Sequence, residues 1–333
     1  MKITDMKNTL EYLFEGNRLT REEAREALIK VGKGMYSEAE FASFLTVFKM
    51  RPLAPEELSG FRDAMIGLCQ ATDLSEYQAI DVVGTGGDGK NTFNISTLAA
   101  FIIAGTGIHV TKHGNYAATS TSGSSNVLEY LGYQFSNDPG KLKNDLDKGG
   151  FCFMHAPLFH PAMKYIAPVR RALKVTTFFN ILGPMINPSS PKYQLLGVNN
   201  KEVFDQYRNV YNTSDVQYLI INSMDGYDEV SLTDDIRFAS KNKEGKFSPS
   251  DFGFGKIDPE KLFGGNSIKE AARIFVNILE GNGTEEQNQV VISNAALGIK
   301  VVYPERELKD CVAQAGESLK SGKALQKMRA VIS

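Results

Sequence analysis

The amino-acid sequence predicts an α/β protein with two parts. A small all-helical N-terminal domain precedes a large α/β domain whose mostly parallel central sheet is flanked by helices. Helical patterns alone fill the first 72 residues, whereas β-like runs alternate with helical patterns from residue 79 onward. With 333 residues, the chain is long enough for both. We place the helical domain at 1–72, joined by a segment near 163–190, and the α/β domain at 73–333.

The helices of the first part are indicated by their start signals. TREE (20–23) and SEAE (37–40) both fit the capping box, in which a hydroxyl is followed three residues later by Glu. Pro55 stands where the first residue of a helix would lie. Apolar residues recur at helical spacing at Phe41, Phe44, Leu45 and Phe48. We expect a packed bundle face, part of which could serve dimerisation.

The second part follows a strand-then-helix pattern. The β-like runs are AIDVV (79–83), IHVTKH (108–113), FCFMHA (151–156), YQLLGV (193–198) and VQYLIINS (216–223). Helical patterns lie between them, and two or three further helices are expected from Ser267 on. The polar stretch 240–251 predicts a surface loop or hairpin. Because ligands of such folds bind at the carboxyl ends of strands, the loops that follow the runs are the place to look for chemistry.

Composition excludes several classes of protein. Lys and Arg total 37 against 39 for Asp and Glu, so no global basic field attracts nucleic acid. No charge-free stretch reaches membrane-spanning length, and the N-terminus does not resemble a signal peptide. Cys69, Cys152 and Cys311 are far apart and odd in number, which favours reduced core residues over disulfides or a zinc site. We therefore expect a cytoplasmic protein that binds neither membranes nor nucleic acid.

The stretch DVVGTGGDGKNTFNIST (81–97) is the first that could carry chemistry. Four glycines within 84–89 follow a β-like run, and hydroxyl residues precede a helical pattern. Glycine permits positive φ and close approach of the backbone, and N–H groups at a loop and a helix start attract anions. Phosphate or diphosphate is the natural ligand. The spacing fits neither the Walker loop nor the dinucleotide fingerprint, and Asp88 argues against a bare phosphate site.

Two further strand ends carry polar groups. VTKHGNYAATSTSGSSNVLEYLG (110–132) places Lys112 at the end of one run, before small residues that open a helix. It suggests a second anion cradle, so the ligand would carry phosphates at both ends. INSMDGYDEVSLTDD (221–235) contains the adjacent carboxylates of Asp228 and Glu229. Alone this would be an acidic solvated loop, but beside two phosphate cradles it predicts Mg²⁺, which bridges carboxylates to substrate phosphates.

The segment 156–188 offers Arg170, which could bind a carboxylate through two hydrogen bonds or could be a solvated helix end. His155 and His160 are five residues apart, so they do not share a helix face as a metal pair would. No nucleophile triad and no G-x-S-x-G elbow is present. We expect no catalytic nucleophile, and catalysis by positioning and electrostatics instead.

Taken in order, these stretches resemble the anthranilate phosphoribosyltransferases. GTGGDG with the following T, N and ST, then KHGN, SGS with VLE and LG, HPAMK with APVRR, FFNILGP and DG with DEVS all appear in the family order, over nearly the whole chain. The resemblance implies transfer of the phosphoribosyl group of phosphoribosyl diphosphate to anthranilate, in tryptophan biosynthesis, with diphosphate released. It also implies Mg²⁺ as cofactor and a homodimer formed through the helical domain.

The resemblance also implies roles for single residues. Those that would bind phosphoribosyl diphosphate are Gly84, Gly87, Asp88, Thr92, Asn94, Ser96, Thr97, Lys112, Asn115, Ser120 and Ser124. Those that would contact anthranilate are Gly84, Asn115, His160 and Arg170, with Arg170 facing the carboxylate. Those that would bind Mg²⁺, directly or through water, are Ser96, Asp228 and Glu229.

The chain departs from the family pattern at four positions. Tyr116 and Thr176 stand where many members have Arg, Asn222 where many have His, and Asn126 where Asp is frequent. Losing two positive charges predicts weaker binding of a second aromatic acid in the entry route, with catalysis kept. Two alternatives stay open: a pyrimidine nucleoside phosphorylase-like enzyme, and a non-enzymatic nucleic-acid-binding relative. The stretch SGSSNVLEYLG that follows Lys112 argues against the phosphorylase. The near-neutral charge balance and the presence of Arg170 argue against the nucleic-acid-binding relative.

Overall fold

The structure is a computed structural model that describes residues 5–117 and 121–332. The chain divides into two compact units. The first comprises the residues up to Ala71 together with Pro157–Pro188, and the second comprises Thr72–Ala156 and the residues from Ser189 on. A segment from the middle of the sequence therefore completes the N-terminal helical unit.

The first unit is entirely helical in its described part. Its helices are α1 (Met6–Phe14), α2 (Arg21–Gly32), α3 (Glu38–Met50), α4 (Pro55–Leu68), α9 (Met163–Leu173) and α10 (Phe179–Leu182), with a 3-10 turn at Gly183–Met185. The two predicted capping boxes are confirmed at the starts of α2 and α3, and Pro55 is the first residue of α4. Helices α2 and α4 pack closely because Gly60 has no side chain: a Cβ there would lie 2.2 Å from the Arg21 carbonyl oxygen.

Aromatic side chains fill the core of this unit. Phe61 stacks on Phe178 at a centroid distance of 4.3 Å, and Phe44 and Phe48 meet Phe61 edge to face. The predicted apolar stripe of α3 is therefore buried, as a bundle face should be. Since Phe178 comes from the mid-chain segment, that segment belongs to the same core.

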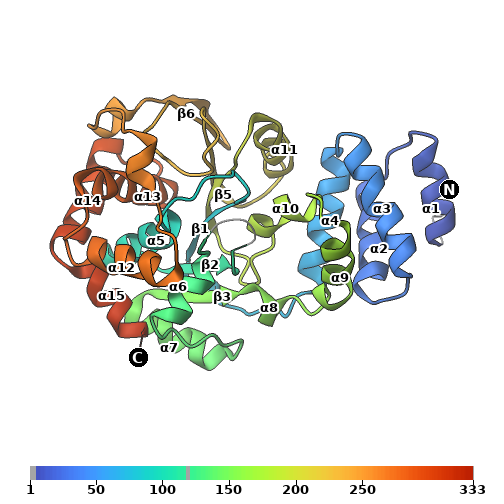
Figure 1. The fold of residues 1–333 in the computed structure, drawn as a ribbon, viewed down its shortest axis with the longest axis horizontal. Helices are drawn as coiled ribbons and strands as arrows, with labels where there is room; N and C mark the ends of the chain where they lie inside the picture. Colours follow the sequence, from blue (N-terminus) through green and yellow to red (C-terminus); the bar gives the residue numbers. More distant parts are fainter. Residues whose placement is uncertain (1–4, 118–120, 333) are drawn as a thin grey trace. The chain divides into compact units, whose positions relative to one another are not determined.

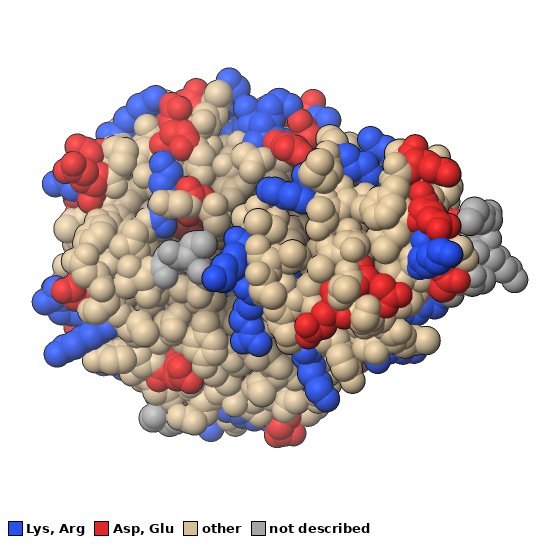
Figure 2. Space-filling view, turned by 45° about the vertical axis from the view of Figure 1, so that its right-hand side comes forward, with Lys and Arg blue, Asp and Glu red and all other residues tan. Residues whose placement is uncertain are grey.

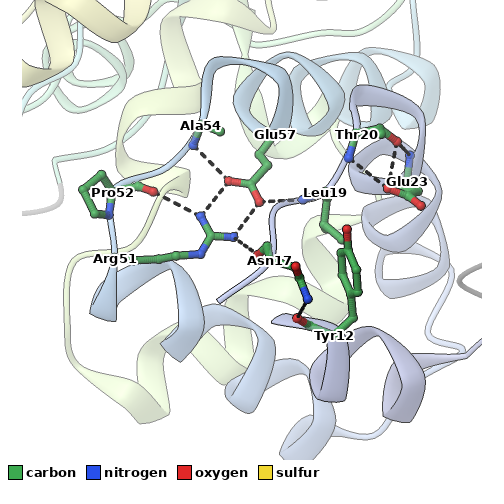
Figure 3. A network of polar contacts seen from close by, with 9 residues as sticks. All are labelled: Tyr12, Asn17, Leu19, Thr20, Glu23, Arg51, Pro52, Ala54 and Glu57. Carbon is green, nitrogen blue, oxygen red and sulfur yellow. Dashed lines mark hydrogen bonds and ion pairs between the residues drawn. The ribbon is translucent and has the colours of Figure 1, made fainter. Parts of the chain in front are cut away.

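A buried ion pair fastens the connections between these helices (Figure 3). Glu57 on α4 is fully buried and accepts two hydrogen bonds from Arg51, at 2.6 and 2.8 Å. The same carboxylate accepts the backbone N–H groups of Leu19 and Ala54, at 3.0 and 2.9 Å. One carboxylate thus joins the segment before α2, the end of α3 and the start of α4.

The second unit contains a seven-stranded sheet within its described residues. The strands are β1 (Ile80–Gly84), β2 (Val110–Gly114), β3 (Phe151–His155), β4 (Tyr193–Gly197), β5 (Gln217–Ser223), β6 (Ile236–Ser240) and β7 (Glu244–Phe247). Their spatial order is β3-β2-β1-β4-β5-β6-β7; the first five pair in parallel, and β6 pairs antiparallel with both β5 and β7. The mostly parallel sheet predicted from the sequence is confirmed.

Helices cover this sheet (Figure 1). They are α5 (Ile95–Gly105), α6 (Ser124–Tyr130), α7 (Pro139–Gly149), α11 (Lys201–Tyr211), α12 (Ile268–Leu279), α13 (Glu285–Val302), α14 (Leu308–Lys320) and α15 (Lys323–Val331), with 3-10 turns at Ser75–Tyr77, Pro249–Phe252 and Pro259–Leu262. The short helix α8 (Ala156–Phe159) contains the point in the chain where the second unit gives way to the first. Helix α5 is apolar almost all round, because it packs against both the sheet and the C-terminal helices α13, α14 and α15.

Two expectations for the C-terminal half need correction. The tail forms four helices, not two or three, because the polar stretch 303–307 separates α13 from α14 and Gly322 separates α14 from α15. The polar stretch 240–251 does contain a hairpin turn, but the turn joins two strands, β6 and β7, of which β6 was not foreseen. Arg237 and Ser240 interrupt the apolar pattern of β6, which hides the strand in the sequence.

On the face shown in Figure 2, acidic and basic side chains lie in small groups of either sign, separated by uncharged surface. In the described part of the chain, no helix is both long and apolar enough to span a membrane.

Candidate active site

The topology of the sheet indicates where a ligand would bind. From β1 the chain continues outward through β2 and β3, then returns to pair β4 on the other side of β1. The carboxyl ends of β1 and β4, where Gly84 pairs with Gly197, therefore form a switch point, the usual ligand crevice of open α/β sheets. The glycine loop 84–89 begins there.

The glycine loop needs its glycines for two reasons. Gly86, Gly87 and Gly89 have φ of 65°, 71° and 72°, a region that other residues rarely adopt. Gly84 and Gly197 instead make room for the 225–229 loop: a Cβ on Gly84 would lie 2.2 Å from Asp228 Oδ2, and one on Gly197 would lie 1.6 Å from the Asp228 carbonyl oxygen. The Gly86 N–H donates to Asp228 Oδ2 at 2.6 Å. The strand ends thus hold Asp228 directly against the loop.

Three of the expected residues meet below this loop. Lys112, on β2, is 2% exposed, and its Nζ donates to the Val82 carbonyl oxygen at 2.5 Å and to Ser96 Oγ at 3.2 Å. The Ser96 N–H, in the first turn of α5, donates to Glu229 Oε1 at 2.9 Å. Lys112 is therefore a buried cation that supports Ser96, and its ammonium group lies close enough to Asp228 and Glu229 to interact with both electrostatically.

The surroundings of Asp228 and Glu229 disfavour the ionised form of both side chains. Burial, and the repulsion of Asp88, raise the pKa of Asp228 to about 7. Burial, and the neighbouring Asp228, raise the pKa of Glu229 to about 8. Burial also raises the pKa of Asp88, whose carboxyl shares a hydrogen bond with that of Asp228. A bound cation would relieve the repulsion among these carboxyls and favour their ionised forms.

Hard oxygen donors of this kind fit Mg²⁺. Within the described residues no three His, Cys, Asp or Glu side chains converge on one point as a complete metal cage would require. Two adjacent carboxylates and the Ser96 hydroxyl do lie together, however. Such a partial set suits Mg²⁺, which usually keeps waters and takes its remaining ligands from substrate phosphates.

The start of α5 carries the other residues expected from the first loop. Asn94 is its N-cap, and the Asn94 Nδ2 group donates to the Ser122 carbonyl oxygen at 3.2 Å. Thr92 pairs with Phe263 in an isolated antiparallel β-bridge, whereas Thr97 is only 1% exposed and lies in the core. Asp88 Oδ1 accepts the Lys90 N–H at 3.0 Å, so Asp88 also fixes its own loop.

The loop after β2 brings Asn115 and Ser124 together. The Asn115 carbonyl oxygen accepts the Ser124 hydroxyl at 3.4 Å and the Ser125 N–H at 3.2 Å. Gly114 permits this approach, since a Cβ there would lie 2.4 Å from Ser124 Oγ. Ser120, another expected residue, lies outside the described residues.

The residues that the resemblance placed in the site omit two polar groups at this edge, although Ser122 lies at the helix start of the second predicted cradle. Thr85 Oγ1 and Ser122 Oγ are buried, as is Asn94 Oδ1, and none of the three has a hydrogen-bond partner among the described residues. Buried polar atoms without partners are rare in proteins and indicate a ligand or water. The signal was present in the sequence, since Thr85 lies within GTGG and Ser122 within TSGS, but nothing there distinguished these hydroxyls from their neighbours.

Arg170 and His160 belong to the first unit. Arg170 lies in the last turn of α9, its guanidinium over the Phe179 ring at 5.3 Å and 3.4 Å from Asn180 Oδ1. Burial lowers the pKa of Arg170, and within the described residues no carboxylate pairs with it. His160 is 3% exposed, and burial lowers its pKa to about 4, so its imidazole is neutral.

Fold and site together define a class of transferase. The family model described as glycosyl transferase family, a/b domain, matches residues 76–325, and the model described as glycosyl transferase family, helical bundle domain, matches residues 7–69. Anthranilate phosphoribosyltransferases of Phocaeicola vulgatus and Flavobacterium johnsoniae are 48% and 49% identical to the chain, in each case over 97% of it and 98% of the relative. The chain belongs to the anthranilate phosphoribosyltransferase family.

Solved structures agree. The anthranilate phosphoribosyltransferase of Thermus thermophilus superimposes with a TM-score of 0.91 at 32% identity, covering 97% of this chain and 98% of that one. The enzyme of Saccharomyces cerevisiae in complex with PRPP and Mg also gives 0.91, at 27% identity, over 98% of this chain and 96% of that one. The same yeast enzyme has been solved with 4-fluoroanthranilate.

Proposed function

We propose that this protein transfers the 5-phosphoribosyl group of phosphoribosyl diphosphate to the amine of anthranilate, giving N-(5-phosphoribosyl)anthranilate and diphosphate, in tryptophan biosynthesis. The observation that carries the proposal is the meeting of a glycine loop with the buried carboxyls of Asp228 and Glu229 at the switch point of the sheet. Relatives at 48% identity over nearly the full length bear the name of this activity.

The α/β unit would bind phosphoribosyl diphosphate. Loop residues Gly84, Gly87 and Asp88 and the start of α5 would hold the diphosphate end. The loop after β2 would hold the other phosphate and the sugar through Asn115, Ser120 and Ser124. The hydroxyls of Thr85 and Ser122 have no partner among the described residues, so they are natural additional donors to a ligand phosphate, which would supply acceptors. Lys112 would act on the ligand indirectly, through its hydrogen bond to the Ser96 hydroxyl.

Ser96, Asp228 and Glu229 would hold Mg²⁺ at this end. When bound, the ion would neutralise charge on the leaving diphosphate. The chain itself contributes the rest: Asp228 is aligned by the Gly86 N–H, and Glu229 by the Ser96 N–H. Negative charge grows on the diphosphate as its bond to the ribose breaks. Groups that are already held in place to stabilise this charge therefore lower the barrier.

Arg170 would bind the carboxylate of anthranilate. A half-buried guanidinium that lies over an aromatic ring and pairs with no carboxylate among the described residues suits a planar aromatic acid. Gly84, Asn115 and His160 remain predicted contacts of the same substrate. The aniline nitrogen is a weak nucleophile with a lone pair to donate, so it needs placement at the ribose carbon more than a base.

One assay tests the reaction. The protein, anthranilate, phosphoribosyl diphosphate and Mg²⁺ are mixed, and the loss of anthranilate fluorescence is followed. We expect Mg²⁺-dependent loss in the wild type, and almost none when Asp228→Asn is combined with Glu229→Gln. A folded wild-type protein that leaves the fluorescence unchanged would refute the proposal, and normal turnover in the double variant would refute the metal assignment.

Arg170 has its own test. Arg170→Ala should raise the KM for anthranilate about a hundredfold, because a charge-assisted pair of hydrogen bonds is worth about 2–3 kcal/mol. The KM for phosphoribosyl diphosphate should stay within about twofold. Arg171→Ala is the matched control, since Arg171 is the exposed neighbour in the same helical turn. Equal KM values for anthranilate in the two variants would contradict the assignment.

Two further predictions come from the sequence. A homodimer formed through the helical unit accords with the exposed apolar side chains of that unit, among them Phe14 and Met50. A cytoplasmic location stays a prediction.

A further inference from the structure

Asn126, on α6, joins the two arms of the loop that follows β2, which are residues 115–117 and residues 121–124. Its Oδ1 accepts the Ala117 N–H at 2.9 Å and the Gly123 N–H at 3.0 Å. One amide oxygen therefore binds a backbone group on each side of residues 118–120. Asn126 lies outside the set of residues to which the sequence assigned a role in binding.

The two arms are in backbone contact beside this amide. A Cβ on Gly123 would lie 2.5 Å from the Ala117 nitrogen and 2.9 Å from the Asn115 carbonyl oxygen. The first arm is also attached to α6 through Tyr116, whose hydroxyl donates to Glu129 Oε1 at 3.0 Å. With no side chain at position 123, the arms can approach closely enough for one acceptor to reach both N–H groups.

The clamped arms carry the polar groups of the candidate site. Asn115 lies two residues before Ala117, and Ser122 and Ser124 flank Gly123. Asn94 ties the second arm to the start of α5 by donating to the Ser122 carbonyl oxygen. The side-chain oxygens of Asn94 and Ser122 are buried and have no partners among the described residues, so both are available to form hydrogen bonds with a ligand.

We propose that Asn126 is a positioning residue for phosphoribosyl diphosphate, which it never touches: by clamping Ala117 to Gly123 it holds Asn115, Ser122 and Ser124 in the arrangement that the ligand requires. The inference rests on the proposed function. Its physical content is preorganisation, since arms that are already ordered lose less entropy when the ligand binds.

The clamp needs an oxygen acceptor at position 126 but not an amide as such. Asn126→Asp keeps an oxygen in the same place and can accept both N–H groups. Asn126→Ala removes the acceptor and leaves two backbone donors without their partner. Thr284→Ala is the matched control, because it removes the capping hydrogen bond that the Thr284 hydroxyl accepts from the Gln287 N–H at the start of α13, away from this loop.

The first measurement is amide hydrogen exchange without substrates. We expect Asn126→Ala to exchange faster at Ala117 and Gly123 by about tenfold or more, and Asn126→Asp to stay near the wild type. The second measurement is steady-state kinetics. Asn126→Ala should raise the KM for phosphoribosyl diphosphate about tenfold. It should raise the KM for anthranilate less, because Asn115 is the only clamped group that is also a predicted contact of anthranilate. Asn126→Asp and Thr284→Ala should change neither KM appreciably.

Three outcomes would overturn the inference: unchanged exchange in Asn126→Ala, KM values that rise alike for both substrates, or no recovery in Asn126→Asp. A lowered melting temperature with unchanged KM values would also overturn it, since the role would then be structural. An inactive but folded wild type would instead refute the proposed function, and the two failures are therefore distinguishable.

Discussion

At the scale of single residues, burial changes what a charged side chain can do. Lys112 was predicted to face an anion at the end of its strand, yet its ammonium is buried and donates hydrogen bonds to the Val82 carbonyl oxygen and Ser96 Oγ. It would thus act on a ligand through Ser96 and the nearby carboxyls. Asp88, which seemed out of place in an anion site, shares a hydrogen bond with Asp228 and caps its own loop. A cation between these groups and a diphosphate would account for both.

His160 makes the stability of the helical unit depend on pH. Its pKa is lowered to about 4 by burial, from an ordinary value of about 6.5. Below about pH 6.5 the unfolded chain binds a proton that the folded chain refuses, so stability falls as the pH drops toward 4. Between about pH 7.5 and pH 5.5 this group alone should cost about 1 kcal/mol.

Urea unfolding of the wild type and of His160→Gln at both pH values measures this effect. The glutamine side chain does not titrate, so the variant should lose about 1 kcal/mol less than the wild type on acidification. Equal losses in the two proteins would show that His160 is protonated without penalty in the folded state.

At the scale of elements, the ion pair of Arg51 and Glu57 should be a sensitive point of the helical bundle. Arg51→Ala leaves a fully buried carboxylate without its cation, which costs about 3 kcal/mol or more. Adding Glu57→Gln should recover part of that loss. The amide removes the buried charge but keeps only one oxygen. It can therefore accept the N–H of Leu19 or of Ala54, which donate to different oxygens of the carboxylate, and the recovery is partial.

Chemical denaturation of the single and double variants gives these free energies. Arg25→Ala serves as the control, because Arg25 pairs with Glu22 at the surface and should contribute less than about 1 kcal/mol. A double variant less stable than Arg51→Ala alone would contradict the explanation based on buried charge.

At the scale of the whole molecule, the helical unit should mediate a homodimer. Phe14, Met35 and Met50 are 67%, 63% and 81% exposed, which is unusual for large apolar side chains in a bundle. Light scattering should give the mass of two chains for the wild type. Met50→Lys should shift the equilibrium toward the monomer, whereas Met224→Lys, at an exposed apolar residue of the α/β unit, should not. A monomeric wild type would end this prediction.

Much of the fold could be predicted because its signals are local. Capping boxes at Thr20 and Ser37, the proline that starts α4, and strand-helix alternation each depend on neighbours within a few residues. The hairpin strand β6 escaped notice because polar residues interrupt its pattern and because it lies next to the edge of the sheet, between β5 and the edge strand β7. The fourth C-terminal helix escaped because its boundary is a short turn.

The sequence by itself determined the architecture, the family and the residue types near the ligand, since glycine loops, adjacent carboxylates and helix starts are visible as short motifs. Only the tertiary structure decided which distant groups meet. It buried Lys112 under Ser96, set Asp228 against Gly86, and gave Asn126 two backbone partners on opposite arms of one loop. These contacts depend on strand order and on close backbone approach, which are properties of the packed sheet and not of any local stretch.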